Sequence, residues 1–178
     1  MDCIFSHPND FSPICTTEII GLAKADTYFK KINTELIGIS VDSLNSHLAW
    51  LYDIYLKTGL IVNFPIIADQ NGVIARKYGM ISNDVSSTET VRNIFIIDDK
   101  GIIRSIFVYP MNIGRYIPEI LRTVTALQYS DQNNCMTPAN WSPGNPMIVP
   151  PPKTFNALRE RNESINKNRN GMCWYLSF

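Results

Sequence analysis

Cys15 is the residue of this chain whose type and position best suit chemistry. It comes after residues 7–13, which have the composition of a turn, and it opens a stretch with the apolar spacing of a helix. Backbone N–H groups at the first turn of a helix are unpaired, and the helix dipole is positive there. Both effects favour the thiolate, which is the nucleophilic form of cysteine. The sequence therefore predicts a nucleophilic Cys15.

The residues around Cys15 suit the same role. Ser12 offers a hydroxyl that can hydrogen-bond to the sulfur or to an incoming oxygen, and Pro8 and Pro13 stiffen the loop. Glu18 lies one turn later, where it could hold a distant arginine in position. Taken singly, a cysteine at a helix start is more often a packed residue. The combined pattern of Pro, Ser, Cys and the following Thr-Thr-Glu favours chemistry instead.

Strands and helices alternate along the part of the chain that must position this segment. Apolar runs predict strands at residues 4–6, 36–41, 64–68, 93–97 and 102–108. Helical spacing predicts helices from about residue 15, from residue 44, over 73–78 and from about 114 to 129, with a polar loop at 82–89. This order predicts an α/β fold with a mixed central sheet flanked by helices, a class that includes the thioredoxin-like fold.

The composition changes after residue 128. Residues 130–153 contain six of the eleven prolines, and residues 156–171 are polar and rich in Asn and Arg. Such a segment buries little on its own, so we expect an extended tail that wraps on a partner subunit. The sequence thus predicts a domain at residues 1–127 and a C-terminal arm at residues 128–178.

Charge, hydropathy and cysteine spacing argue against several classes of protein. Sixteen basic and sixteen acidic residues cancel, which argues against nucleic-acid binding. No apolar run reaches the roughly 18 residues of a membrane span, and the N-terminus does not resemble a signal peptide. The four cysteines form no CxxC pair, which argues against a zinc site or a disulfide scaffold. We expect a cytoplasmic protein that binds neither nucleic acid nor membrane.

The segment SHPNDFSPICTTE closely resembles the active-site segment of the 1-Cys-type peroxiredoxins. Other segments resemble that family in the same order: IGISVDS with HLAW, FPIIAD, VRNIFIIDDKGIIR, YPMNIGRYIPEILR, TPANWSPG and VPPPKT. The resemblance covers nearly the whole chain. It implies a thioredoxin-like peroxidase domain followed by the C-terminal dimerisation arm of this family.

The resemblance also assigns roles to residues. It implies that Cys15 attacks a peroxide and becomes a sulfenic acid, that Pro8 shields the sulfur, and that Arg92 lies over it. Ser12 stands where the family usually has Thr, and it keeps the hydroxyl. Three further residues are implied to support the site: Arg115, Glu18 and His7. This chemistry needs no metal and no other cofactor.

Substrate and partners follow from the same resemblance. It implies reduction of hydrogen peroxide and alkyl hydroperoxides in antioxidant defence, an external thiol reductant such as thioredoxin or glutathione, and a homodimer that can assemble into a decamer. Cys173 looks like a cysteine that resolves the sulfenic acid in some relatives. The alternative is an unpaired tail cysteine. For Cys3 and Cys135 we expect a core residue and a bystander.

The chain departs from the family at its start, because family members normally have an N-terminal hairpin before this segment. This departure motivates a second hypothesis: a truncated, weakly active or inactive peroxiredoxin that acts as a chaperone-like or redox-signalling protein. A thioredoxin-type disulfide oxidoreductase is a third option. The segment after Cys15 argues against it, because Glu18 stands where the second cysteine of a CxxC motif would be.

Overall fold

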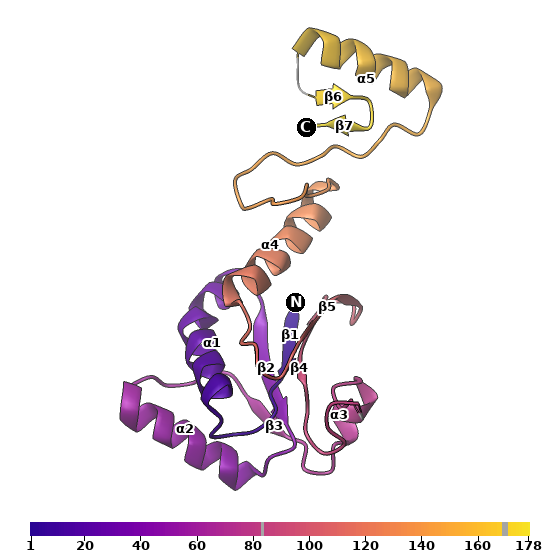
Figure 1. The fold of residues 1–178 in the computed structure, drawn as a ribbon. Helices are drawn as coiled ribbons and strands as arrows, with labels where there is room; N and C mark the ends of the chain where they lie inside the picture. The colour runs from indigo at the N-terminus through magenta and orange to yellow at the C-terminus, as the bar shows by residue number, and fades with distance from the viewer. Residues whose placement is uncertain (83, 169–170) are drawn as a thin grey trace. The chain divides into compact units, whose positions relative to one another are not determined.

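A five-stranded mixed sheet forms the centre of the first of two compact units, Met1–Leu121 (Figure 1). The computed structural model describes residues 1–82, 84–168 and 171–178. The strand order is β3-β2-β1-β4-β5, with β1, β2 and β3 parallel to one another and β4 and β5 antiparallel to their neighbours. The strands are β1 (Asp2–Ser6), β2 (Glu35–Ser40), β3 (Ile66–Ala68), β4 (Arg92–Ile97) and β5 (Ile103–Tyr109). The predicted mixed sheet is confirmed.

Three helices lie within this unit, and a fourth leads out of it. They are α1 (Pro13–Lys31), α2 (Leu44–Thr58), α3 (Val73–Lys77) and α4 (Ile117–Asn133). Ser12 and Ser43 cap α1 and α2 by accepting backbone N–H groups, and Pro13 opens α1. Gly59 ends α2 in the left-handed conformation (φ 69°), which only glycine adopts without steric cost.

Alternate residues of β1 pack against different elements on the two faces of the sheet. Ile4 packs on one face against the cluster of Ile39, Ala75, Met80 and Phe95, which includes α3. Phe5 points to the other face, where its ring lies under the guanidinium of Arg115 (5.2 Å). That guanidinium in turn binds Glu18 of α1. The second face therefore carries the ionic groups, and the first is an apolar core.

α1 and α4 approach each other closely at Gly21. A Cβ atom at this position would lie 2.4 Å from Cδ1 of Ile117, so a larger residue would require the Ile117 side chain to move. This packing fixes the start of α4 against the middle of α1. It also sets the chain direction of the segment before α4, which carries Arg115.

The second unit, Arg122–Phe178, has secondary structure of its own. The prediction of an extended tail at 156–171 is wrong for 156–168, which lie in α5 (Phe155–Asn168), and for residue 171, which opens β6. Thr154 caps α5 by accepting the Ala157 N–H at 3.2 Å, and Ile165 on one side of the helix is buried. Composition suggested an extended segment, but a capped helix with one apolar side can bury that side against its surroundings.

A short hairpin, β6 (Gly171–Cys173) with β7 (Leu176–Ser177), follows α5. The proline-rich segment is tied to it, because Val149 donates its N–H to the Ser177 carbonyl at 2.9 Å. Trp141 is buried, its ring centre lies 5.6 Å from that of Tyr129, and its indole N–H donates to the Asn145 carbonyl. The arm therefore has a small core. Residue 83 of the predicted loop and residues 169–170 of the predicted tail lie outside the described residues.

The unit boundary falls between Leu121 and Arg122, and the boundary predicted after residue 127 also falls inside α4. None of the described helices combines the length and hydropathy needed to cross a bilayer.

Candidate active site

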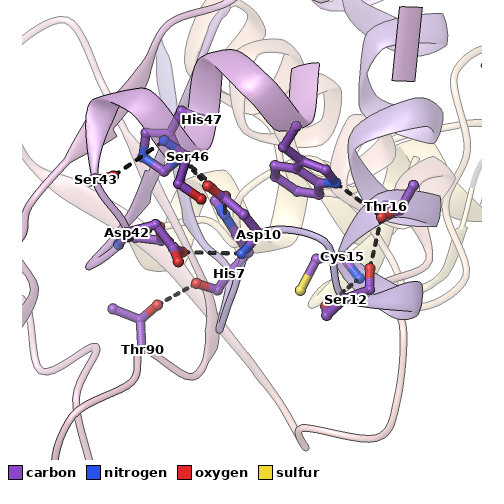
Figure 2. Close-up of polar contacts among 12 residues, drawn as sticks. His7, Asp10, Ser12, Cys15, Thr16, Asp42, Ser43, Ser46, His47 and Thr90 are labelled. Atoms are coloured by element: carbon purple, nitrogen blue, oxygen red, sulfur yellow. Dashed lines mark hydrogen bonds and ion pairs between the residues drawn. The ribbon is translucent and has the colours of Figure 1, made fainter. Parts of the chain in front are cut away.

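Cys15 lies in the first turn of α1 and is fully buried. The loop at residues 7–12 leads from the end of β1 into this turn. Ser12 is the N-cap, and its hydroxyl accepts the backbone N–H of Cys15 at 3.3 Å (Figure 2). The positive end of the α1 dipole thus lies at the sulfur, as predicted from the sequence.

Arg92 lies against the Cys15 sulfur. It is the first residue of β4, and its Nη1 donates to Cys15 Sγ at 3.3 Å and to Glu18 Oε2 at 2.7 Å. Its Nε donates to the carbonyl of Met111 at 2.9 Å. These contacts fix the guanidinium at the sulfur. The structure therefore brings Cys15, Arg92 and Glu18 together.

Glu18 binds a second arginine at the same time. Arg115 donates from Nε to Oε1 at 2.9 Å and from Nη2 to Oε2 at 2.7 Å, and its backbone N–H donates to Oε1 at 2.9 Å. Its Nη1 donates to the carbonyls of Ser6 and Asn93. All three ionic side chains are buried, and the two arginines carry one positive charge more than Glu18 balances. A Cys15 thiolate cancels that excess.

His7 belongs to a buried network that includes two residues not singled out from the sequence. Asp10 Oδ1 lies 3.0 Å from His7 Nε2, and Asp10 Oδ2 lies 2.8 Å from His47 Nδ1 (Figure 2). His47 comes from α2, where it lies on the same buried side as Trp50 and Ile54. The sequence did contain a signal for this network: His47 falls on the apolar side of a predicted helix, and a buried imidazole needs a polar partner.

Burial and pairing set the charges of this network. Burial raises the pKa of Asp10, but hydrogen bonds from His47 and His7 outweigh it and leave that pKa well below its ordinary value. Burial lowers the pKa of His7, and it stays lowered despite the Asp10 hydrogen bond. Burial also lowers the pKa of His47, but the hydrogen bond and charge of Asp10 outweigh it and leave it raised. Asp10 is therefore ionised and His7 neutral at neutral pH.

The ligand atoms of His7, Asp10 and His47 lie within 4.8 Å of one another, which is close enough to hold a metal. The hydrogen bonds between them already occupy those atoms. We therefore describe the three residues as a hydrogen-bond network.

Trp50 joins α2 to the first turn of α1. Its indole N–H donates to Thr16 Oγ1 at 3.1 Å, and Thr16 donates to the Ser12 carbonyl at 2.8 Å. The His7 ring lies 5.2 Å from the indole. Pro8 is buried in the same loop. The loop and the helix turn that carry Ser12 and Cys15 are thus held from several sides.

The other cysteines have different surroundings. Cys3 is buried in β1, as predicted, and burial raises the pKa of its thiol to about 12. Cys135 and Cys173 lie in the second unit and are half-buried, and none of the four cysteines is in a disulfide. A hydrogen bond with Cys173 raises the pKa of Tyr175.

Comparison with known sequences settles the family. The sequence profile of the AhpC/TSA family matches residues 3–106, and that of the C-terminal domain of 1-Cys peroxiredoxin matches residues 126–164. The chain belongs to the AhpC/TSA family. Its C-terminal segment matches that of the 1-Cys peroxiredoxins, and its relatives are named peroxiredoxins. Peroxiredoxins are thiol peroxidases, so the chain is an oxidoreductase of this class.

Individual relatives agree with this assignment. Peroxiredoxin 2 of Caldanaerobacter subterraneus is 50% identical over 175 residues, which are 98% of this chain and 79% of the relative. A peroxiredoxin of Aquifex aeolicus is 49% identical, over 97% of this chain and 81% of the relative. The structure of a yeast mitochondrial 1-Cys peroxiredoxin superposes with a TM-score of 0.85 at 40% identity, covering 99% of this chain and 84% of the other. These likenesses confirm the predicted thioredoxin-like fold.

Proposed function

We propose that Cys15 reduces hydrogen peroxide and small alkyl hydroperoxides and becomes a sulfenic acid in the reaction. The observation that carries this proposal is the Arg92 guanidinium, which lies 3.3 Å from the buried Cys15 sulfur. A buried cation at a cysteine in the first turn of a helix favours the nucleophilic form of the thiol.

The reaction begins when the Cys15 thiolate attacks the terminal oxygen of the peroxide. The S–O bond forms as the O–O bond breaks, so the sulfur is oxidised and the peroxide is reduced. The leaving oxygen departs as hydroxide or alkoxide and takes a proton from solvent to give water or an alcohol. Negative charge moves from sulfur to oxygen in this step. Hydrogen-bond donors of Arg92, fixed in position by Glu18 and Met111, stabilise that charge.

The remaining predicted site residues have supporting roles in this proposal. Arg115 and Glu18 hold Arg92 in a buried ionic network that the thiolate neutralises. Ser12 fixes the turn that carries Cys15, and its hydroxyl is available to the peroxide oxygens. Pro8 is buried in the loop, where it helps to exclude water from the sulfur. No step in this sequence is assigned to a metal or another cofactor.

A thiol must then reduce the sulfenic acid. We assign this step to an external thiol such as thioredoxin or glutathione. The C-terminal match to the 1-Cys peroxiredoxins supports this assignment, as does the yeast relative, whose thiol is resolved via the glutathione and thioredoxin systems. Cys173, in β6, is the alternative resolving thiol. The four cysteines are widely spaced along the sequence and form no CxxC pair, which supports a reducing compartment, and we propose the cytoplasm.

A homodimer is part of the proposal, and the edge of the sheet supports it. Among the described strands, β5 has a strand neighbour on one side only. Ile106 and Val108 share a face of this edge strand and are 53% and 69% exposed. An exposed apolar edge is suited to pairing with a second copy of the chain, and such dimers could assemble further into a decamer. Light scattering of Val108→Lys tests this part, and an unchanged mass would contradict it.

Intact mass spectrometry after one equivalent of hydrogen peroxide tests the reaction itself. Dimedone traps sulfenic acids, and peptide mapping locates the adduct. We expect the adduct on Cys15 and a cycle that requires an added thiol. A Cys15–Cys173 disulfide would keep the peroxidase reaction but make Cys173 the resolving residue. An unmodified Cys15 would overturn the proposal and leave the chaperone-like or signalling role.

A further inference from the structure

Thr16, the residue after Cys15, links the catalytic turn of α1 to α2 (Figure 2). Its hydroxyl donates to the Ser12 carbonyl at 2.8 Å and accepts the indole N–H of Trp50, on α2, at 3.1 Å. A threonine hydroxyl can donate one hydrogen bond and accept others, so the two contacts are compatible. The reaction proposed for Cys15 assigns no role to this chain of hydrogen bonds.

Trp50 is the firmly held end of this chain. It is 1% exposed and lies on the buried side of α2 together with His47 and Ile54. The centre of the His7 ring lies 5.2 Å from that of the indole ring. A buried indole N–H needs an acceptor, and Thr16 Oγ1 is the acceptor in this structure. Trp50 therefore offers Thr16 a donor that is fixed in position.

The hydrogen bond from Trp50 matters because the packing between α1 and α2 is open at this point. A hollow of about 240 Å³ lies beside the bond, and Thr16, Ile20, Trp50 and Ile54 are among the residues that line it. The N–H groups in the first turn of a helix also have no partner within the helix, and helix ends fray. The bond from Trp50 therefore ties the start of α1 to the rest of the unit.

We propose that Thr16 is a positioning residue, which Trp50 anchors and which fixes the first turn of α1 in place. Its hydroxyl and its backbone N–H both donate to the Ser12 carbonyl, at 2.8 Å and 3.0 Å, so Thr16 holds the residue that caps Cys15. Arg92 holds the same turn from the sulfur side. Without the link to Trp50, the turn would shift relative to Arg92 while closed and would open more often. The inference rests on the peroxide reaction proposed for Cys15.

Four variants isolate the link. Thr16→Val keeps the size and branching of the side chain but removes its hydroxyl, and Trp50→Phe removes the indole N–H. Thr16→Ser keeps the hydroxyl and should behave like the wild type. Thr17→Val is the matched control, because Thr17 lies in the same turn and its exposed hydroxyl donates within that turn, to the Ile14 carbonyl at 2.7 Å.

The first measurement is the rate at which a bulky maleimide modifies Cys15 in the reduced protein, read by peptide mapping. At about pH 9, above the ordinary pKa of ~8.5 of a free thiol, access to the sulfur limits this rate. We expect Thr16→Val and Trp50→Phe to react about five- to tenfold faster than the wild type, which corresponds to the loss of one hydrogen bond. Cys3, buried in β1, is the internal control and should stay slow in every variant. Unchanged Cys15 rates, or faster modification of Cys3 as well, would overturn the proposal.

The second measurement is the rate of Cys15 oxidation by hydrogen peroxide. Thr16→Val and Trp50→Phe should react about tenfold more slowly, because small displacements of reacting groups slow reactions strongly, and the double variant should be no slower than either alone. Thr16→Ser and Thr17→Val should match the wild type. Unchanged rates in Thr16→Val, or additive losses in the double variant, would overturn the inference. A wild-type protein that does not react would refute the peroxidase proposal instead, and the maleimide rates would still report on the turn.

Discussion

Cys3 and Cys15 are both almost completely buried in the first unit, yet their surroundings differ in almost every other respect. Cys3 lies in β1 between two paired strands, so the backbone N–H groups around it belong to the sheet. Burial raises the pKa of its thiol to about 12, and the charge of Arg115 opposes this only in part. Cys15 lies in the first turn of α1, and Nη1 of Arg92 lies 3.3 Å from its Sγ.

The contrast shows that burial alone does not determine what a thiol can do. Removing water destabilises a thiolate unless fixed dipoles or charges replace the lost hydration. β1 supplies no such replacement to Cys3. At Cys15 the N-terminus of α1 and the Arg92 guanidinium replace the lost hydration. The Glu18 carboxylate in turn replaces the hydration that the two buried arginines lose. Substitutions at these residues test the difference, and the largest effect is expected at the sulfur itself.

Exchanging each sulfur for oxygen tests the contrast most directly. Cys15→Ser should abolish peroxide consumption in the presence of dithiothreitol, because no other described thiol has a guanidinium at its sulfur. Cys3→Ser should consume peroxide at the wild-type rate, provided that circular dichroism shows the fold intact. An active Cys15→Ser protein would mean that the reactive residue has been misidentified.

Arg92→Lys should slow the reaction of Cys15 with hydrogen peroxide by about 10²–10³-fold, the usual effect of losing a fixed donor to a developing oxyanion. Lysine keeps the charge but cannot contact Cys15, Glu18 and Met111 together in the fixed geometry of a guanidinium. Stopped-flow fluorescence measures the rate. Arg104→Lys, on β5, is the control and should react normally; equal rates in the two variants would show that charge alone suffices.

Glu18→Gln should lower the free energy of unfolding by about 3–5 kcal/mol, because it leaves two buried guanidinium groups without their carboxylate. Urea unfolding followed by circular dichroism gives the value. Glu163→Gln, whose carboxylate lies in an exposed pair with Arg159, is the matched control and should change stability little. A small effect at Glu18 would show that the arginines find other partners or water.

Ser12→Ala should destabilise the protein by about 1 kcal/mol, because α1 loses its N-cap. Ser12→Thr should retain wild-type stability and peroxide reactivity, since threonine also caps and the family usually has it here. Thermal unfolding and the peroxide rate are the two readouts. Loss of reactivity in both variants would indicate that the size of residue 12 matters more than its hydroxyl.

The smallest expected effect concerns acid stability. The folded pKa of Asp10 lies below its ordinary value of 3.8, so its contribution is fully present above that pH and is lost as the pH falls further. Unfolding free energies measured from pH 5 downward should therefore fall less steeply in Asp10→Asn than in the wild type. Parallel curves would mean that Asp10 is not specifically stabilised as a carboxylate in the folded state.

Much of the fold could be predicted from the sequence, because its signals are local. The alternation of apolar runs with helical spacing predicted the five strands of the sheet and the first four helices, with the first helix beginning at about residue 15. α5 was missed, because the polar composition of residues 156–168 concealed a helix that Thr154 caps and Ile165 anchors. Composition describes the average of a segment, whereas a cap and one buried residue are enough to order it.

The sequence by itself determined that Cys15 lies near the start of a helix and that the Ser12 hydroxyl precedes it. Through the family resemblance it also indicated that Arg92 and Arg115 belong to the site. Only the tertiary structure decided that Arg92 from β4 and Arg115 from the segment before α4 both bind the Glu18 carboxylate of α1. It also placed His47 of α2 on Asp10, which no sequence pattern had linked. The physical reason is that these interactions act over different distances along the chain. Helix caps and dipoles act within one turn of the chain, whereas buried charges are balanced only when the sheet brings distant segments together.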